Sequence, residues 1–144
     1  MQEYLFIGKS IYNALMETYY IDVGNGSWGV LVCTDYNTLL HGDDIWAILR
    51  SFGMSNRKAE EALRVLSQPN TGMAVSNDDI RMSVIFVGDA TSNDEYWDTM
   101  SHEVMHVVTA IIDYYNKPYN GEDAAHLNGY LTKKIVQQIG EPCY

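Results

Sequence analysis

Cysteine is scarce in this chain of 144 residues, which contains only Cys33 and Cys143. The two lie far apart in the sequence and neither belongs to a C-x-x-C pair, so we expect reduced thiols rather than a disulfide framework or a cysteine zinc site. No stretch of about 18 consecutive apolar residues occurs, and the N-terminal segment lacks the basic start and apolar stretch of a signal peptide. These absences predict a soluble, cytoplasmic protein.

Basic residues are also few, with nine lysines and arginines against 19 aspartates and glutamates, which gives a formal net charge of −10 at pH 7. A charge of this sign repels phosphate backbones and anionic membrane surfaces, and it attracts divalent cations. We therefore expect neither nucleic acid nor a membrane as a partner.

The sequence contains no internal repeat, no low-complexity tract and no long linker, and its hydrophobic share of 47% is enough for one core. We predict a single domain over residues 1–144. Its N-terminal part, residues 1–69, is expected to hold a hairpin and helices. Its C-terminal part, residues 70–144, is expected to hold a second hairpin and two further helices.

Local signals place the elements of the N-terminal part. Residues 2–18 have the pattern of a short helix. Two strand-like runs, 19–23 and 27–33, flank the Asn25-Gly26 pair, which is a strong signal for a tight hairpin turn. Residues 41–53 and 54–67 then show helical spacing, the first ending at a glycine and the second beginning with a serine cap.

The C-terminal part continues with two apolar runs around the turn-forming "SNDD", which predict a hairpin over residues 70–88. The longest helix follows. Ser92 and Glu95 form a capping box at its start, and Pro118 forces its end. Asn120 can cap a last helix that ends at Gly140.

The long helix carries the H-E-x-x-H pattern at residues 102–106. Imidazoles four residues apart stack one turn apart on a helix, which is the spacing that lets both bind one metal ion. Glu103 projects from the flank, where it can address a metal-bound water as a general base. His102 and His106 fall opposite the apolar stripe of this helix, which consists of Trp97, Met100, Val104, Val107, Val108, Ile111 and Tyr115.

A catalytic zinc site takes three protein ligands and keeps one position for water, so a third ligand must come from elsewhere. In the last helix, Glu122 and His126 lie on the face opposite its apolar stripe of Ala124, Leu127, Leu131 and Ile135. Either side chain could complete the site, because the helix is expected to fold back antiparallel to the motif helix.

The stretch from Asn70 to His106, "NTGMAVSNDDIRMSVIFVGDATSNDEYWDTMSHEVMH", followed by "GEDAAHLNGYL", resembles the small zinc peptidases of phages and prophages of the minimal gluzincin type. The resemblance covers roughly residues 70–135, and its most specific parts are "TMSHEVMH" and the E-x-x-A-x-L-x-G-Y spacing. It implies that His102, His106 and Glu122 bind zinc and that Glu103 is the catalytic base. Such proteins often have an aromatic residue four positions after the ligand glutamate, and this chain has His126 at that position.

The fold that the resemblance implies is a small zincin-like α+β domain. A short, mostly antiparallel sheet packs on the motif helix, which is followed by the antiparallel ligand-bearing helix. A substrate is expected along a sheet edge beside the motif helix, and residues 82–87 are the strand best placed for it. The alternative for these residues is an ordinary core strand.

The implied activity is hydrolysis of a peptide or protein substrate with zinc as the cofactor. The oxyanion would need a further donor, for which His126, Tyr114, Tyr119 and Tyr130 are candidates. Two alternatives stay open: a phage-derived metal-binding module without catalysis and a metal-free interaction module. Glu103 argues against the first, because a structural metal site has no use for that residue.

Overall fold

Two hairpins rich in β-branched and aromatic residues supply the sheet. Strands β1 (Glu17–Val23) and β2 (Trp28–Thr34) form the first, and β3 (Gly72–Asn77) and β4 (Met82–Val87) form the second. Gly26 in the first turn has φ +88°, a conformation that favours glycine. Both predicted hairpins are therefore confirmed.

The two hairpins join through a parallel pairing of β2 with β4, so the strand order is β1-β2-β4-β3. The predicted α+β class is confirmed, with one parallel pair at the centre of a mixed sheet. β4 is hydrogen-bonded on both sides and is almost entirely buried. The prediction that residues 82–87 form the edge for a substrate is therefore wrong, because the crossover from β2 places β4 inside the sheet. The edge strand of this hairpin is β3.

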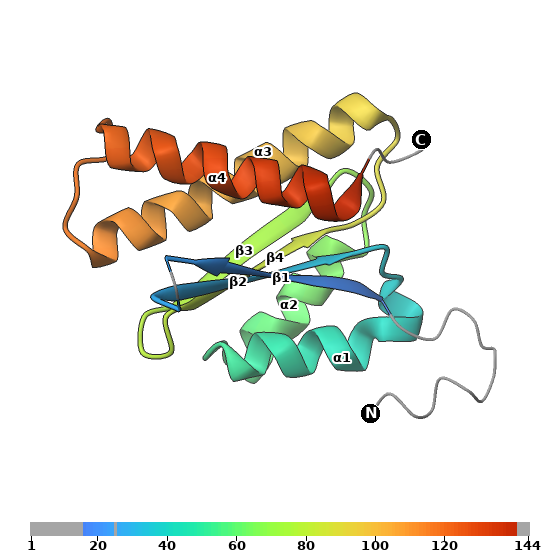
Figure 1. Ribbon diagram of the computed structural model, residues 1–144. Coiled ribbons are helices and arrows are strands. Elements are labelled where there is room, and N and C mark those ends of the chain that lie inside the picture. The colour runs from blue at the N-terminus through green and yellow to red at the C-terminus, as the bar shows by residue number, and fades with distance from the viewer. Residues whose placement is uncertain (1–15, 25, 141–144) are drawn as a thin grey trace.

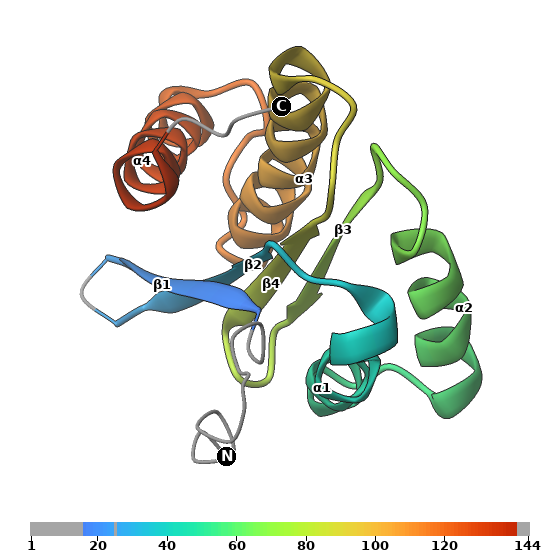
Figure 2. The same cartoon turned by 90° about the vertical axis from the view of Figure 1, so that its right-hand side faces the viewer.

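Helices cover both faces of this sheet in the computed structural model, which describes residues 16–24 and 26–140 (Figure 1). The helices α1 (Thr38–Ser51) and α2 (Asn56–Leu66) lie on one face. The helices α3 (Asn93–Tyr114) and α4 (Glu122–Ile139) lie on the other, and Figure 2 shows the resulting three layers. Within the described part of the chain, no helix has the length and apolar character needed to cross a membrane.

The helix starts follow the capping signals in most cases. The side chain of Ser55 accepts a hydrogen bond from the backbone of α2, and that of Ser92 accepts one from the backbone N–H of Glu95 at 3.1 Å. At α4 the N-cap is Gly121 without a side-chain bond, so the prediction that Asn120 caps this helix is wrong. The chain turns at Gly121, which places Asn120 one residue too early.

The predicted helix at residues 2–18 is wrong where it can be compared, since residues 17–18 belong to β1. Pairing with β2, in which Thr18 faces Cys33, outweighs the helical spacing of this segment. Residues 2–15 lie outside the described residues.

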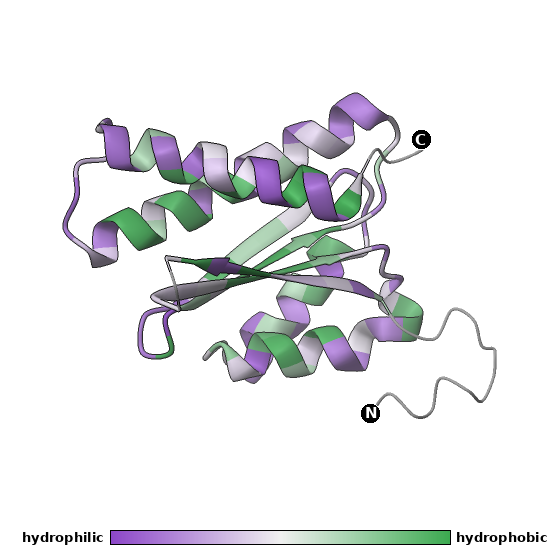
Figure 3. Ribbon diagram, viewed as in Figure 1, coloured by the Kyte–Doolittle hydropathy of each residue, from purple (hydrophilic) through white to green (hydrophobic). Residues whose placement is uncertain are grey.

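Each face of the sheet has its own hydrophobic core, and each helix alternates hydrophobic and hydrophilic stretches (Figure 3). The core under α3 and α4 includes Trp28, Val32, Ile85, Met100, Val104, Val107, Ile111, Leu131 and Ile135. Fully burying one such side chain contributes roughly 1.5–3 kcal/mol to folding. The apolar stripe of α4 is thus confirmed as the core face of that helix.

The buried face of α3 differs from the predicted stripe at its two ends. Tyr96 is 3% exposed, whereas Trp97 is only partly buried and Tyr115 is 40% exposed. Tyr115 follows the last helical residue, and its hydroxyl donates a hydrogen bond to the carbonyl of Ser27 at 3.2 Å. The buried face of α3 is rotated relative to the predicted stripe because α3 packs against both the sheet and α4.

Candidate metal centre

His102 and His106 lie one turn apart on the solvent side of α3, and both are exposed as the sequence predicts. Their Nε2 atoms are 3.1 Å apart. Two nitrogens bound to one tetrahedral zinc at 2.0–2.1 Å are about 3.3 Å from each other. The pair therefore presents two nitrogen donors at nearly the separation that one zinc ion requires. In the absence of metal, the same approach is a hydrogen bond in which one ring nitrogen donates and the other accepts.

Glu103, the residue between them, points in another direction. Its side chain is 6% exposed and faces the edge strand β3, rather than projecting from the flank of α3 as the spacing alone suggests. Its carboxylate makes no hydrogen bond or ion pair with any residue in the described ranges. Burial raises the pKa of this carboxyl group, and the nearby His102 and His106 lower it. The result is a buried carboxylate whose lone pairs are available to a ligand or a water.

Gly72 in β3 is the residue that lets Glu103 reach this position. A Cβ atom at Gly72 would lie 2.7 Å from Thr99 Cγ2, 2.9 Å from the carbonyl oxygen of Phe86 and 3.0 Å from Glu103 Cγ. The first two distances are too short for a real Cβ atom, and the third is a tight contact that Glu103 would have to relieve by a small shift. The absence of a side chain at Gly72 therefore brings the start of β3 into contact with the stem of Glu103.

Gly72→Ala is expected to reduce the free energy of unfolding by about 1–3 kcal/mol, because the added methyl group forces α3 away from β3. Gly129→Ala is a matched control in α4, where an added Cβ meets nothing within 4 Å. This control is expected to stabilise the protein by about 0.5–1 kcal/mol. Urea unfolding measures both values. A Gly72→Ala variant as stable as the wild type would show that α3 and β3 are not held this closely.

A cavity of about 220 Å³ opens beside Glu103 between α3 and the start of β3. We call it the β3 cavity. It is lined by Asn70, Gly72, Asp98, Thr99, His102 and Glu103. Sequence reasoning missed Asp98 and Asn70. Asp98 could have been found, because it lies four residues before His102 and therefore one turn away on the same helix.

Glu122 and His126 lie together on α4, apart from the histidine pair. His126 Nε2 is 3.3 Å from Glu122 Oε1, and both side chains are largely exposed. In the part of the chain that the structure describes, no three histidine, cysteine, aspartate or glutamate side chains gather closely enough to hold a metal ion. The structure thus brings His102 and His106 together but does not join either candidate third ligand to them.

The register of the two helices explains the separation of Glu122 from the histidine pair. Asn128 Nδ2 of α4 lies 2.8 Å from Met105 Sδ of α3, which sets Asn128 level with the motif. Glu122 is six residues earlier, which is about 9 Å along the helix axis. Helical side chains lean toward their own N-terminus, so in this antiparallel pair Glu122 and the histidines lean away from each other.

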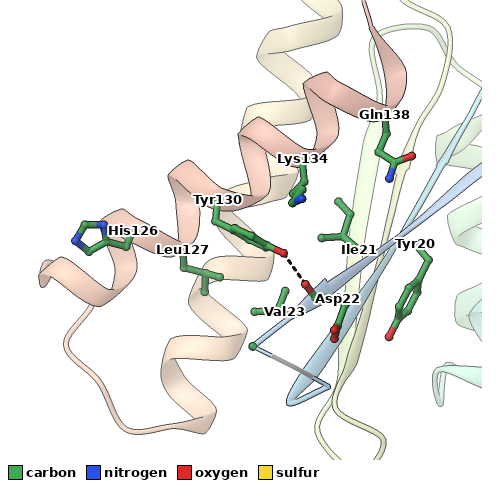
Figure 4. A pocket seen from close by; sticks show the side chains of 10 residues that line it. Tyr20, Ile21, Asp22, Val23, His126, Leu127, Tyr130, Lys134 and Gln138 are labelled. Carbon is green, nitrogen blue, oxygen red and sulfur yellow. Dashed lines mark hydrogen bonds between the residues drawn. The ribbon is translucent and has the colours of Figure 1, made fainter.

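The predicted oxyanion donors also lie elsewhere. His126 and Tyr130 line a different cavity of about 590 Å³ between α4 and β1 (Figure 4). There the hydroxyl of Tyr130 donates a hydrogen bond to the carbonyl of Asp22 at 2.8 Å. Tyr119 donates to Asp113, and Tyr114 packs edge-on against Trp28. None of the four predicted donors is among the residues that line the β3 cavity.

The candidate centre therefore consists of two converging imidazoles, a buried carboxylate without a partner and an adjoining cavity at the end of an edge strand. Imidazole nitrogens are donors that zinc takes, and a zinc ion held by these two would need a third ligand. Comparison of the chain with protein families, with curated proteins and with solved structures found no match.

Proposed function

We propose that the protein is a zinc-dependent hydrolase of peptide bonds, with the metal held by His102 and His106. The observation that supports this most directly is the 3.1 Å approach of the two Nε2 atoms beside a buried carboxylate that has no partner among the described residues. Helical spacing alone places the imidazoles, but it does not require a carboxylate to stay buried and unpaired. Because this carboxylate lines a cavity and has no protein partner among the described residues, it can accept hydrogen bonds from a water or a ligand.

Zinc bound there would polarise the scissile carbonyl and lower the pKa of a water molecule. Glu103 would accept a proton from that water at its carboxylate and pass it to the leaving amine. The packing of its stem against Gly72 limits its freedom and so keeps the carboxylate at the β3 end of the site. An ordered base needs less reorganisation during the reaction.

The substrate in this proposal is an extended peptide bound along β3. This strand is paired with β4 on one side only, so its other edge can add a further strand through backbone hydrogen bonds. Because Gly72 lies in β3 and contacts Glu103, a peptide on this edge would pass close to the base. This role replaces the one that the sequence predicted for residues 82–87.

The third zinc ligand stays a prediction. The resemblance implies Glu122, which would have to approach the histidine pair by a movement of α4 relative to α3. The separation of Glu122 and His126 from the pair favours a second candidate function, a module that binds metal weakly or not at all and acts through interaction.

Metal analysis of protein purified without a histidine tag tests the proposal. We expect about one zinc per chain, and we expect a chelator to lower the melting temperature, because a ligand that binds only the folded state stabilises it. At a free zinc concentration 100 times Kd, this stabilisation is about 2.7 kcal/mol.

The control is the double variant His102→Ala, His106→Ala, whose melting temperature should not respond to zinc or to the chelator. A wild-type protein without zinc, whose melting temperature also ignores added zinc, would leave the metal-free interaction module as the function.

A further inference from the structure

We propose that the β3 cavity is the subsite for a lysine or arginine side chain of the substrate, with Asp98 as the residue that binds its charge. The substrates would then be peptides with a basic residue next to the scissile bond. This inference rests on the proposed function, and it adds the class of side chain that the site selects.

The charge of the cavity lining supports a cationic ligand. Two of its lining residues, Asp98 and Glu103, carry carboxylates, and none is lysine, arginine or a large apolar residue. Asn70 and Thr99 add polar groups. The volume of about 220 Å³ is below the 300–1,000 Å³ of sites for whole drug-sized ligands, so it suits a single side chain.

The two carboxylates leave α3 in different directions and can have separate roles. Five residues along a helix turn it by about 500°, which leaves Asp98 and Glu103 roughly 140° apart around α3, with Thr99 between them. Glu103 lies at the β3 side, where the peptide backbone would pass. A side chain from that backbone would cross Thr99 and reach the exposed carboxylate of Asp98.

Two further observations indicate a ligand site rather than an incidental hollow. The Glu103 side chain lines the cavity at 6% exposure without a hydrogen-bond partner among the described residues. The wall formed by Asn70 is held in place, because Asn70 Oδ1 accepts from the backbone N–H of Thr91 at 2.9 Å and Asn70 Nδ2 donates to Thr91 Oγ1 at 3.1 Å. A wall that is ordered before binding lowers the entropic cost of binding.

Binding of short peptides to the full chain without added metal tests this inference independently of catalysis. The probes are two labelled alanine-rich peptides that differ at one position, lysine in one and norleucine in the other, and fluorescence anisotropy gives their dissociation constants. We expect the lysine peptide to bind about tenfold more tightly. Asp98→Asn should remove most of this preference, and Asp98→Lys should reverse it in favour of a peptide with glutamate at that position.

Asp44→Asn is the matched control, since Asp44 is an exposed residue of α1 on the other face of the sheet and the variant has the same net charge as Asp98→Asn. It should keep the full preference. Absence of binding, equal binding of both peptides, or an equal loss in both variants would overturn the subsite. An Asp98-dependent preference in a zinc-loaded protein that cleaves neither peptide would instead reject the proposed hydrolysis and keep the subsite.

Discussion

Glu103→Gln is expected to lower peptide hydrolysis by about 10²–10⁴-fold while the protein keeps its zinc and its fold. The substitution keeps the shape of the side chain and removes only its ability to accept a proton. Because the Glu103 carboxylate has no hydrogen-bond partner among the described residues, no structural bond is lost with its charge. Rate measurements on zinc-loaded protein, together with zinc stoichiometry and melting temperature, separate the chemistry from binding and stability.

Glu95→Gln provides the control, because Glu95 is an exposed glutamate in the first turn of the same helix. This variant changes the net charge by the same amount and should hydrolyse at the wild-type rate. If Glu103→Gln also cleaves as fast as the wild type, Glu103 is not the base and the proposed chemistry must be abandoned.

His102→Ala and His106→Ala are each expected to weaken zinc binding by more than about 100-fold. Changes to residues that only support a ligand already cost about 10–100-fold in affinity, and each of these variants removes a donor itself. Both side chains are exposed, so neither change removes core packing, and the metal-free proteins should melt close to the wild type. Titration with zinc against a competing chelator measures the affinities.

The same titration on Glu122→Ala and His126→Ala tests the third ligand. The resemblance predicts that Glu122→Ala also loses zinc while His126→Ala keeps it, which would require α4 to shift toward the pair on binding. The present structure, in which neither side chain of α4 gathers with the histidine pair, predicts retention in both variants. If His102→Ala and His106→Ala both retained zinc, these two histidines would not be zinc ligands and the proposed metal centre would be wrong.

The sequence alone determined the features that depend on neighbouring residues. Alternating apolar runs around Asn25-Gly26 and "SNDD" specified both hairpins, because turn chemistry and strand periodicity act over a few residues. Ser55 and Ser92 marked two helix starts for the same reason. The four-residue spacing placed His102 and His106 one turn apart on the same face of the helix, because the helix has a regular geometry.

Only the tertiary structure decided which of these elements meet. The parallel pairing of β2 and β4 placed β4 inside the sheet and left β3 at its edge, and strand order depends on contacts between residues far apart in the chain. The packing of α3 onto Gly72 buried Glu103 and formed the β3 cavity with Asp98. The register of α4 on α3 kept Glu122 away from the histidine pair, because side-chain packing along the whole interface sets that register, whereas helical periodicity defines only the faces.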